Sequence, residues 1–135
     1  MSQVIFINLP VRDVVASARF YAALGFEQNH DFSGETAAAM EWGEVAVMLL
    51  DRAFYATFTD KKIIDARTQS GVLLCLPFES RAAVDDFHDR AARAGGHEAR
   101  PVKDQSGMYG GAVEDPDGHT WETMWMDANA APQPA

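Results

Sequence analysis

The chain has 135 residues, 47% of them apolar, which indicates one globular domain with a sizeable core and argues against a disordered chain. Its net charge of −9 disfavours nucleic acid and anionic membranes as partners, and no apolar run approaches the roughly 20 residues that a membrane-spanning helix needs. Cys75 is the only cysteine, so no intrachain disulfide can form, and with no basic region before the first apolar run the sequence predicts a cytoplasmic protein.

The first half of the chain is predicted to form one β-α-β-β-β unit. Composition and alternation indicate strands over residues 4–9, 26–32, 36–42 and 45–50. Asp13 can cap a helix over residues 14–24, and Gly25 can end it because glycine accepts a left-handed conformation. Residues 54–66 are mixed and suggest a loop with a short helix packed over apolar side chains.

The second half repeats this order. Strand signals recur over residues 72–76, 97–100, 112–114 and 120–126. Ser80 can cap a helix that runs to about Ala94. Phe20 and Phe87 hold the same place in the two halves, and each helix ends in glycine before a strand. Self-similarity over roughly 65 residues indicates a duplicated supersecondary unit.

The predicted fold class is therefore α+β, with two tandem β-α-β-β-β modules that form a curved mixed sheet around a cleft. A single domain is expected over residues 1–128, with module one over about 3–64 and module two over about 70–127. The tail over residues 129–135 is rich in Ala and Pro, and we expect it to be flexible. A cleft between two such sheets is a natural site for a small molecule.

Three stretches carry a family resemblance. They are Asn8-Leu-Pro-Val-Arg-Asp13, Phe20-Tyr-Ala-Ala-Leu-Gly-Phe26 and Asp115-Pro-Asp-Gly-His-Thr-Trp-Glu122. In this order they resemble the vicinal oxygen chelate superfamily, which includes the glyoxalases, bleomycin resistance proteins and extradiol dioxygenases. Within it, the sequence is similar to the predicted lactoylglutathione-lyase-like proteins, in which Trp-Glu-x-Met-Trp-Met-Asp recurs. The resemblance covers residues 3–127 and implies a homodimer, whose cleft is built within one chain or between two.

The metal-dependent members of that family take one ligand from each of four equivalent strands, and the resemblance places one of these ligands at Glu122. The other three positions fall on Phe6, Leu73 and either Met48 or Leu49. A divalent ion needs several oxygen, nitrogen or sulfur ligands in a defined geometry. One carboxylate among apolar side chains does not supply them, so we expect no metal and no other cofactor.

The expected cleft is an apolar pocket around one carboxylate. The predicted ligand-binding residues are Phe6, Asn8, Met48, Leu73, Cys75 and Met124. Strand alternation places Glu122 on the same face as Met124, and Glu122 is the predicted general acid or base. No aligned position supplies a cation, so Glu122 is expected to share a proton with Tyr109 or Asn8. Tyr109, in a glycine-flanked segment, is the second predicted catalytic residue.

The first functional hypothesis is a metal-independent isomerase or lyase that acts on a small oxygenated metabolite. The alternative is a non-catalytic protein that binds a small molecule and confers resistance by sequestration. A third possibility is a protein whose cleft has lost its ligand. No function is assigned to the histidines that are interpreted as surface residues, His30, His88 and His97.

Overall fold

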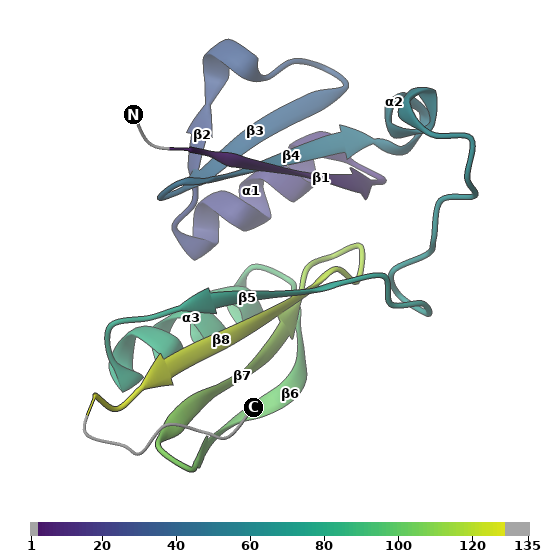
Figure 1. Ribbon diagram of the computed structural model, residues 1–135. Helices are drawn as coiled ribbons and strands as arrows, with labels where there is room; N and C mark the ends of the chain where they lie inside the picture. Colours follow the sequence, from purple (N-terminus) through teal and green to yellow (C-terminus); the bar gives the residue numbers. More distant parts are fainter. Residues whose placement is uncertain (1–2, 129–135) are drawn as a thin grey trace.

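The structure, a computed structural model, describes residues 3–128, so the predicted flexible tail over residues 129–135 lies outside the described residues. Two modules of the same order follow one another along the chain (Figure 1). Module one contains β1 (Ile5–Val11), α1 (Val14–Leu24), β2 (Glu27–Asn29), the short 3-10 helix η1 (His30–Phe32), β3 (Ala37–Trp42) and β4 (Val45–Asp51). A connecting segment begins with α2 (Arg52–Tyr55) and η2 (Ala56–Phe58). Module two contains β5 (Leu73–Pro77), α3 (Arg81–Arg93), β6 (His97–Gln105), β7 (Met108–Glu114) and β8 (Thr120–Met126).

Each module folds into a four-stranded sheet with one long helix on one side. The strand orders are β1-β4-β3-β2 and β5-β8-β7-β6, and the first strand of each module pairs in parallel with the last. In these pairs Asn8 lies opposite Met48 and Cys75 lies opposite Glu122, so Met48 rather than Leu49 holds the place equivalent to Glu122. The predicted α+β fold with two β-α-β-β-β modules is confirmed, but within residues 3–128 the strands form two separate four-stranded sheets and not one curved sheet around a cleft. Within residues 3–128, no helix is long and apolar enough to cross a membrane.

Local sequence explains where the long helices begin and end. Asp13 and Ser80 each accept a hydrogen bond from the backbone amide three residues later, at 3.0 Å, so both predicted N-caps are confirmed. Gly25 ends α1 with a φ of 109°, in the left-handed region that favours glycine. β1 continues through Pro10, which an edge strand tolerates because its missing N–H needs no partner there.

Three predicted strands had the wrong length. β2 covers only Glu27–Asn29, because the Asn29 side chain accepts a hydrogen bond from the Asp31 amide and caps η1. β6 and β7 form a longer hairpin than the sequence predicted, with a turn at Ser106 and Gly107, both at positive φ. The hairpin is rich in polar residues and glycine, so its pairing with β8 rather than its composition holds it in the sheet.

The two long helices lie between the two sheets (Figure 1). α1 packs on β3 and β4, α3 packs on β7 and β8, and the two helices contact each other. An aromatic core joins the modules, in which Tyr21 and Phe26 of module one contact Trp121 of module two edge to face. The other side of each sheet, which neither long helix covers, therefore faces outward. These two surfaces are called here the open face of module one and the open face of module two.

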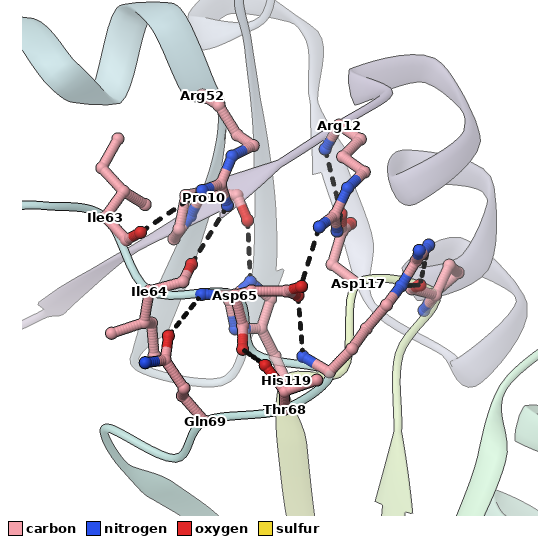
Figure 2. Close-up of polar contacts among 12 residues, drawn as sticks. Pro10, Arg12, Arg52, Ile63, Ile64, Asp65, Thr68, Gln69, Asp117 and His119 are labelled. Carbon is pink, nitrogen blue, oxygen red and sulfur yellow. Dashed lines mark hydrogen bonds and ion pairs between the residues drawn. The ribbon is translucent and has the colours of Figure 1, made fainter.

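Polar contacts tie the modules together at one end of their interface (Figure 2). The Arg12 guanidinium donates to Asp117 Oδ1 and to Asp65 Oδ1, each at 3.2 Å. The His119 ring lies 2.7 Å from the Pro10 carbonyl oxygen, measured from Nε2. The end of β1, the connecting segment and the loop before β8 are thus held as one unit. These contacts fix the relative orientation of the modules and the outward direction of both open faces.

Candidate functional site

Alternate residues of β8 point toward and away from the core, as the sequence predicted. Trp121 and Thr123 are 1% and 4% exposed and belong to the helix-covered side. Glu122 and Met124 have the opposite parity and lie half-buried on the open face of module two. The structure therefore brings together four of the predicted site residues, Leu73, Cys75, Glu122 and Met124.

Glu122 is paired with an arginine that the sequence did not indicate. Arg100 Nη2 donates to Glu122 Oε2 at 3.2 Å, and the Glu122 side chain is 25% exposed. Arg100 lies opposite Ala112, which lies opposite Glu122, so the pair spans three neighbouring strands. The prediction that no cation compensates Glu122 is wrong. The partner was hidden because the β6–β7 register shifts on either side of Arg100, and no local pattern reports such bulges.

Tyr109 lies on the opposite side of the sheet from Glu122. Its hydroxyl donates to Asp85 Oδ1 of α3 at 2.6 Å, and the Arg81 guanidinium lies 5.5 Å from the ring centre. The hydrogen bond to Asp85 also raises the pKa of the Tyr109 hydroxyl. Register explains the direction, because Tyr109 pairs with Trp125, which has the parity of the helix-facing residues. The expected proton sharing between Tyr109 and Glu122 is therefore wrong, and the structure does not bring the two predicted catalytic residues together.

A pocket of about 350 Å³ lies on the open face of module two, beside the ion pair of Arg100 and Glu122. Its lining consists of Arg100, Lys103, Gln105, Ser106, Met108, Tyr109, Gly110, Thr123 and Met124. Of the predicted site residues, Tyr109 and Met124 therefore belong to the lining, and Glu122 adjoins it through its contact with Arg100. Gly110 lets β7 approach β8 closely, because a Cβ there would lie 1.8 Å from the Thr123 carbonyl oxygen. The pocket thus offers two cationic side chains and two methionines to a ligand.

The other predicted ligand-binding residues lie on the open face of module one. Phe6 is 67% exposed, Asn8 is exposed and Met48 is half-buried, whereas Leu49 points into the core. The predicted short helix after β4 is present as α2, which packs against β1 and β4 at one end of this face. Within one chain, the helices and the core separate this face from Glu122. A proton shared between Asn8 and Glu122 in the same chain is therefore excluded.

Cys75 lies beside Glu122 on the neighbouring strand. Burial and the Glu122 carboxylate raise the pKa of the Cys75 thiol, and the positive charge of Arg100 lowers it by less. A thiol with a raised pKa is a poor nucleophile near neutral pH. Cys75 is therefore suited to contact a ligand rather than to attack it.

His88, interpreted from the sequence as a surface residue, is buried. Its side chain contacts Thr123 Oγ1 at 2.7 Å through Nε2, and Thr123 Oγ1 in turn accepts a hydrogen bond from the Gly111 amide at 3.0 Å. Burial lowers the pKa of His88, although Glu98 and Asp85 act in the other direction. A signal for burial was present, because His88 shares the apolar face of α3 with the other buried residues of that helix, Val84, Phe87 and Ala91. The predicted exposure of His30 and His97 is confirmed.

The donor set does not fit the metal that the resemblance implies. The four equivalent strand positions hold Phe6, Met48, Leu73 and Glu122, which together provide a single carboxylate for a metal ion. Nowhere in residues 3–128 do three His, Cys, Asp or Glu side chains gather in a metal-binding arrangement. His119 binds the Pro10 carbonyl oxygen at the module interface and not the site.

Comparisons with known proteins agree with this architecture. A model of the glyoxalase/bleomycin resistance protein/dioxygenase superfamily matches residues 3–123. The structure is similar to hypothetical protein SA1046 from S. aureus, with 26% identity and a TM-score of 0.80 over 93% of this chain and 94% of that chain. A glyoxalase-related enzyme from Fulvimarina pelagi is 24% identical, with a TM-score of 0.79 over 100% and 99% of the two chains. TioX from Micromonospora sp. ML1 shares the fold at 20% identity, with a TM-score of 0.67 over 93% and 100%. No curated protein sequence matches the chain. The chain belongs to the glyoxalase/bleomycin resistance protein/dioxygenase superfamily.

Proposed function

We propose that the protein binds a small organic molecule on the open face of module two, without a metal ion. The observation that carries this proposal is the pocket of about 350 Å³ beside the ion pair of Arg100 and Glu122. Its size lies in the range of small-molecule sites, and its mixture of methionine with a few placed polar groups is typical of them. Met108 and Met124 supply the apolar part of the lining.

The geometry favours binding over catalysis, and the proposed role is resistance by sequestration of the bound molecule. The Tyr109 hydroxyl is engaged by Asp85 on the far side of the sheet, so it is not available to polarise a substrate at Glu122. Glu122 itself already accepts a hydrogen bond from Arg100. The narrower lactoylglutathione-lyase-like assignment and the cytoplasmic location both stay predictions.

A second candidate is a metal-independent isomerase or lyase that acts on a small oxygenated metabolite. It is favoured by one observation, the 25% exposure of the Glu122 side chain beside the pocket. A carboxylate in that place can accept a proton from a bound ligand, while Arg100 binds an oxygen atom of the same ligand. In this candidate Glu122 is the general base, and the Tyr109 hydroxyl, which is bound to Asp85, takes no part in the chemistry.

One experiment separates the two candidates. A panel of small metabolites is tested for a rise in Tm and for turnover, with the wild type, Glu122→Gln and the exposed control Glu27→Gln. A binding protein gives a ligand-dependent rise in Tm and no product with any variant. An enzyme gives product with the wild type and Glu27→Gln, and none with Glu122→Gln. The absence of any rise in Tm across the panel would count against a ligand at this face.

Metal independence has its own test. Three of the four equivalent strand positions are apolar, so purified protein should contain far less than one divalent ion per chain by elemental analysis. About one Zn, Ni, Fe or Mn per chain, lost in Glu122→Ala, would overturn this part of the proposal.

We also propose a homodimer in which the open face of module one covers the open face of module two of the partner. β1 and β5 are edge strands, and their apolar residues Ile5, Phe6 and Leu73 are 59%, 67% and 55% exposed. Exposed edges and apolar faces of this kind are usually covered. A two-fold axis that places β1 beside the partner's β5 also places β5 beside the partner's β1. Both pairs of open faces are then covered, and the dimer contains two equal clefts. All the predicted ligand-binding residues then line one cleft.

A charge at Phe6 tests the dimer. In a monomer Phe6→Glu costs little, because the side chain is 67% exposed, but in the proposed dimer it buries a carboxylate. We expect the wild type to sediment as a dimer and Phe6→Glu as a folded monomer. Val15→Glu is the matched control, since Val15 is 61% exposed on α1 and away from the open faces, and it should stay dimeric. A wild type that sediments as a monomer at all concentrations would contradict the proposal.

A further inference from the structure

The pocket on the open face of module two has the opposite charge to the chain around it. The chain has 20 acidic and 11 basic residues, yet the lining contains Arg100 and Lys103 and neither Asp nor Glu. With the neighbouring Glu122 included, two positive charges and one negative charge leave the site with one net positive charge. A local positive charge of this kind attracts and orients small anions.

Register shifts in the β6–β7 pairing bring both cations to this face. Arg100 and Lys103 are three residues apart, so in a regular strand their side chains would point to opposite sides. Arg100 lies opposite Ala112 and Lys103 lies opposite Gly110, two residues apart on β7, so both have the parity of the open face. Bulges often re-aim a side chain in this way next to binding sites.

Both cations keep donors for a ligand. Arg100 uses Nη2 for Glu122 Oε2 at 3.2 Å and for the Gly111 carbonyl oxygen at 3.5 Å, while a guanidinium carries further N–H groups in a planar fork. Among the ion pairs formed within residues 3–128, none involves Lys103, which is exposed. The pocket thus presents a partly occupied guanidinium and an unpaired ammonium side by side.

Apolar surface adjoins these donors. Met108 and Met124 line the same pocket, and Gly110 adds no side chain of its own between the two strands. Methionine is polarizable and adapts its shape, so it packs well against flat apolar or aromatic groups. The site therefore combines an anion-binding part with an apolar part.

We propose that the ligand of this pocket is a small organic monocarboxylate. Its carboxylate binds Arg100 and Lys103, and its apolar or aromatic body lies against Met108 and Met124. Charge-assisted hydrogen bonds from guanidinium and ammonium groups suit a carboxylate, and one net positive charge matches a monoanion. This inference rests on the proposed small-molecule binding and narrows it to one chemical class.

Matched acids and amides test the inference. Phenylacetate is compared with phenylacetamide, and indole-3-acetate with indole-3-acetamide, because the members of each pair differ in charge but not in body. Protein labelled at the methionine methyl groups reports the site by NMR, with Met40, which is 0% exposed in the core, as the internal control. We expect the acids to shift the Met108 and Met124 signals and to bind about tenfold more tightly than the amides. Added salt should weaken the acids alone.

A pair of variants tests the role of the ammonium group. Lys103→Met should lower the affinity for the acids about tenfold and leave that for the amides unchanged. Lys62→Met makes the same change in an exposed residue of the connecting segment and should have no effect. Amides that bind as tightly as the acids, or an unchanged affinity in Lys103→Met, would overturn the carboxylate assignment while small-molecule binding stands. If neither acids nor amides shift Met108 or Met124, the binding function proposed for this pocket fails as well.

Discussion

The contact between Tyr21 and Asp115 provides a test of what holds the two modules together. Tyr21 is 0% exposed, its hydroxyl donates to Asp115 Oδ2 at 2.6 Å, and it accepts a hydrogen bond from Trp121 Nε1 at 2.8 Å. Asp115 is 1% exposed and also accepts hydrogen bonds from the amides of Asp117 and His119, each at 2.9 Å. Burial and the Asp115 carboxylate raise the pKa of Tyr21 well above its ordinary value, so the hydroxyl remains a donor.

Tyr21→Phe removes this hydroxyl, so the buried Asp115 carboxylate and the buried Trp121 N–H each lose a hydrogen-bond partner. The hydrogen bond to a carboxylate contributes about 1.5–3 kcal/mol, and a buried Trp121 N–H without a partner costs about 1–3 kcal/mol. A loss of about 3 kcal/mol is a large part of the roughly 5–15 kcal/mol by which a domain is stable. For a chain of this length it corresponds to a fall in Tm of about 10 °C.

Tyr109 provides a matched control, because its hydroxyl donates to Asp85 at the same distance of 2.6 Å but on the exposed surface. Water replaces an exposed hydrogen bond when one partner is removed, so Tyr109→Phe should lower Tm much less. Thermal unfolding followed by circular dichroism at neutral pH measures both variants. Equal falls in Tm, or no fall in Tyr21→Phe, would refute the argument that burial decides the strength of this contact.

The remaining predictions concern two titrating side chains. Burial lowers the pKa of His88 despite Glu98 beside it. As the pH drops below about 6.5, the ordinary histidine value, the imidazole is protonated more readily in the unfolded chain than in the folded one, so the stability of the fold decreases. His88→Gln should therefore remove part of the loss of stability in acid, whereas the same change at the exposed His97 should not. Denaturant unfolding at several pH values measures the free energy of unfolding of both variants. The same dependence of that free energy on pH in the two variants would contradict this. Glu122→Gln should speed the alkylation of Cys75 by iodoacetamide at mildly alkaline pH, because the carboxylate helps to raise the pKa of the thiol. A slower or unchanged reaction would show that another group controls Cys75.

The elements with local signals could be predicted from the sequence at their observed bounds. The helix over residues 14–24 has a capping side chain at one end and a glycine at the other, and the strand over residues 120–126 alternates regularly. The duplication could also be predicted, from Phe20 and Phe87 at the same place in the two halves of the sequence. In the structure both side chains are 2% exposed in the shared core. These features depend on neighbours along the chain, which the sequence displays directly.

The parts of the site that depend on pairing between distant strands could not be predicted. The Arg100 partner of Glu122 is set by bulges in the β6–β7 pairing, and the direction of Tyr109 is set by its register with β8. The outward direction of the two open faces follows from contacts between the modules, such as that of Arg12 with Asp117. Each of these features could have a different strand register or orientation with the same local sequence pattern, so periodicity cannot predict which one the chain adopts.

The two open faces differ in chemistry although they hold equivalent places in a duplicated fold. Where module two carries Glu122 and its Arg100 partner, module one has Met48, with Phe6 nearby on the same face. Two apolar faces would not orient a ligand, and two charged faces would bury charge at a high cost. One of each provides an apolar wall for the ligand body and a cationic wall for its carboxylate. Closure by the partner would also exclude water and strengthen the contact of Arg100 with an anion. The dimer and carboxylate proposals are therefore linked, and Phe6→Glu, which should separate the dimer, should also weaken the binding of phenylacetate.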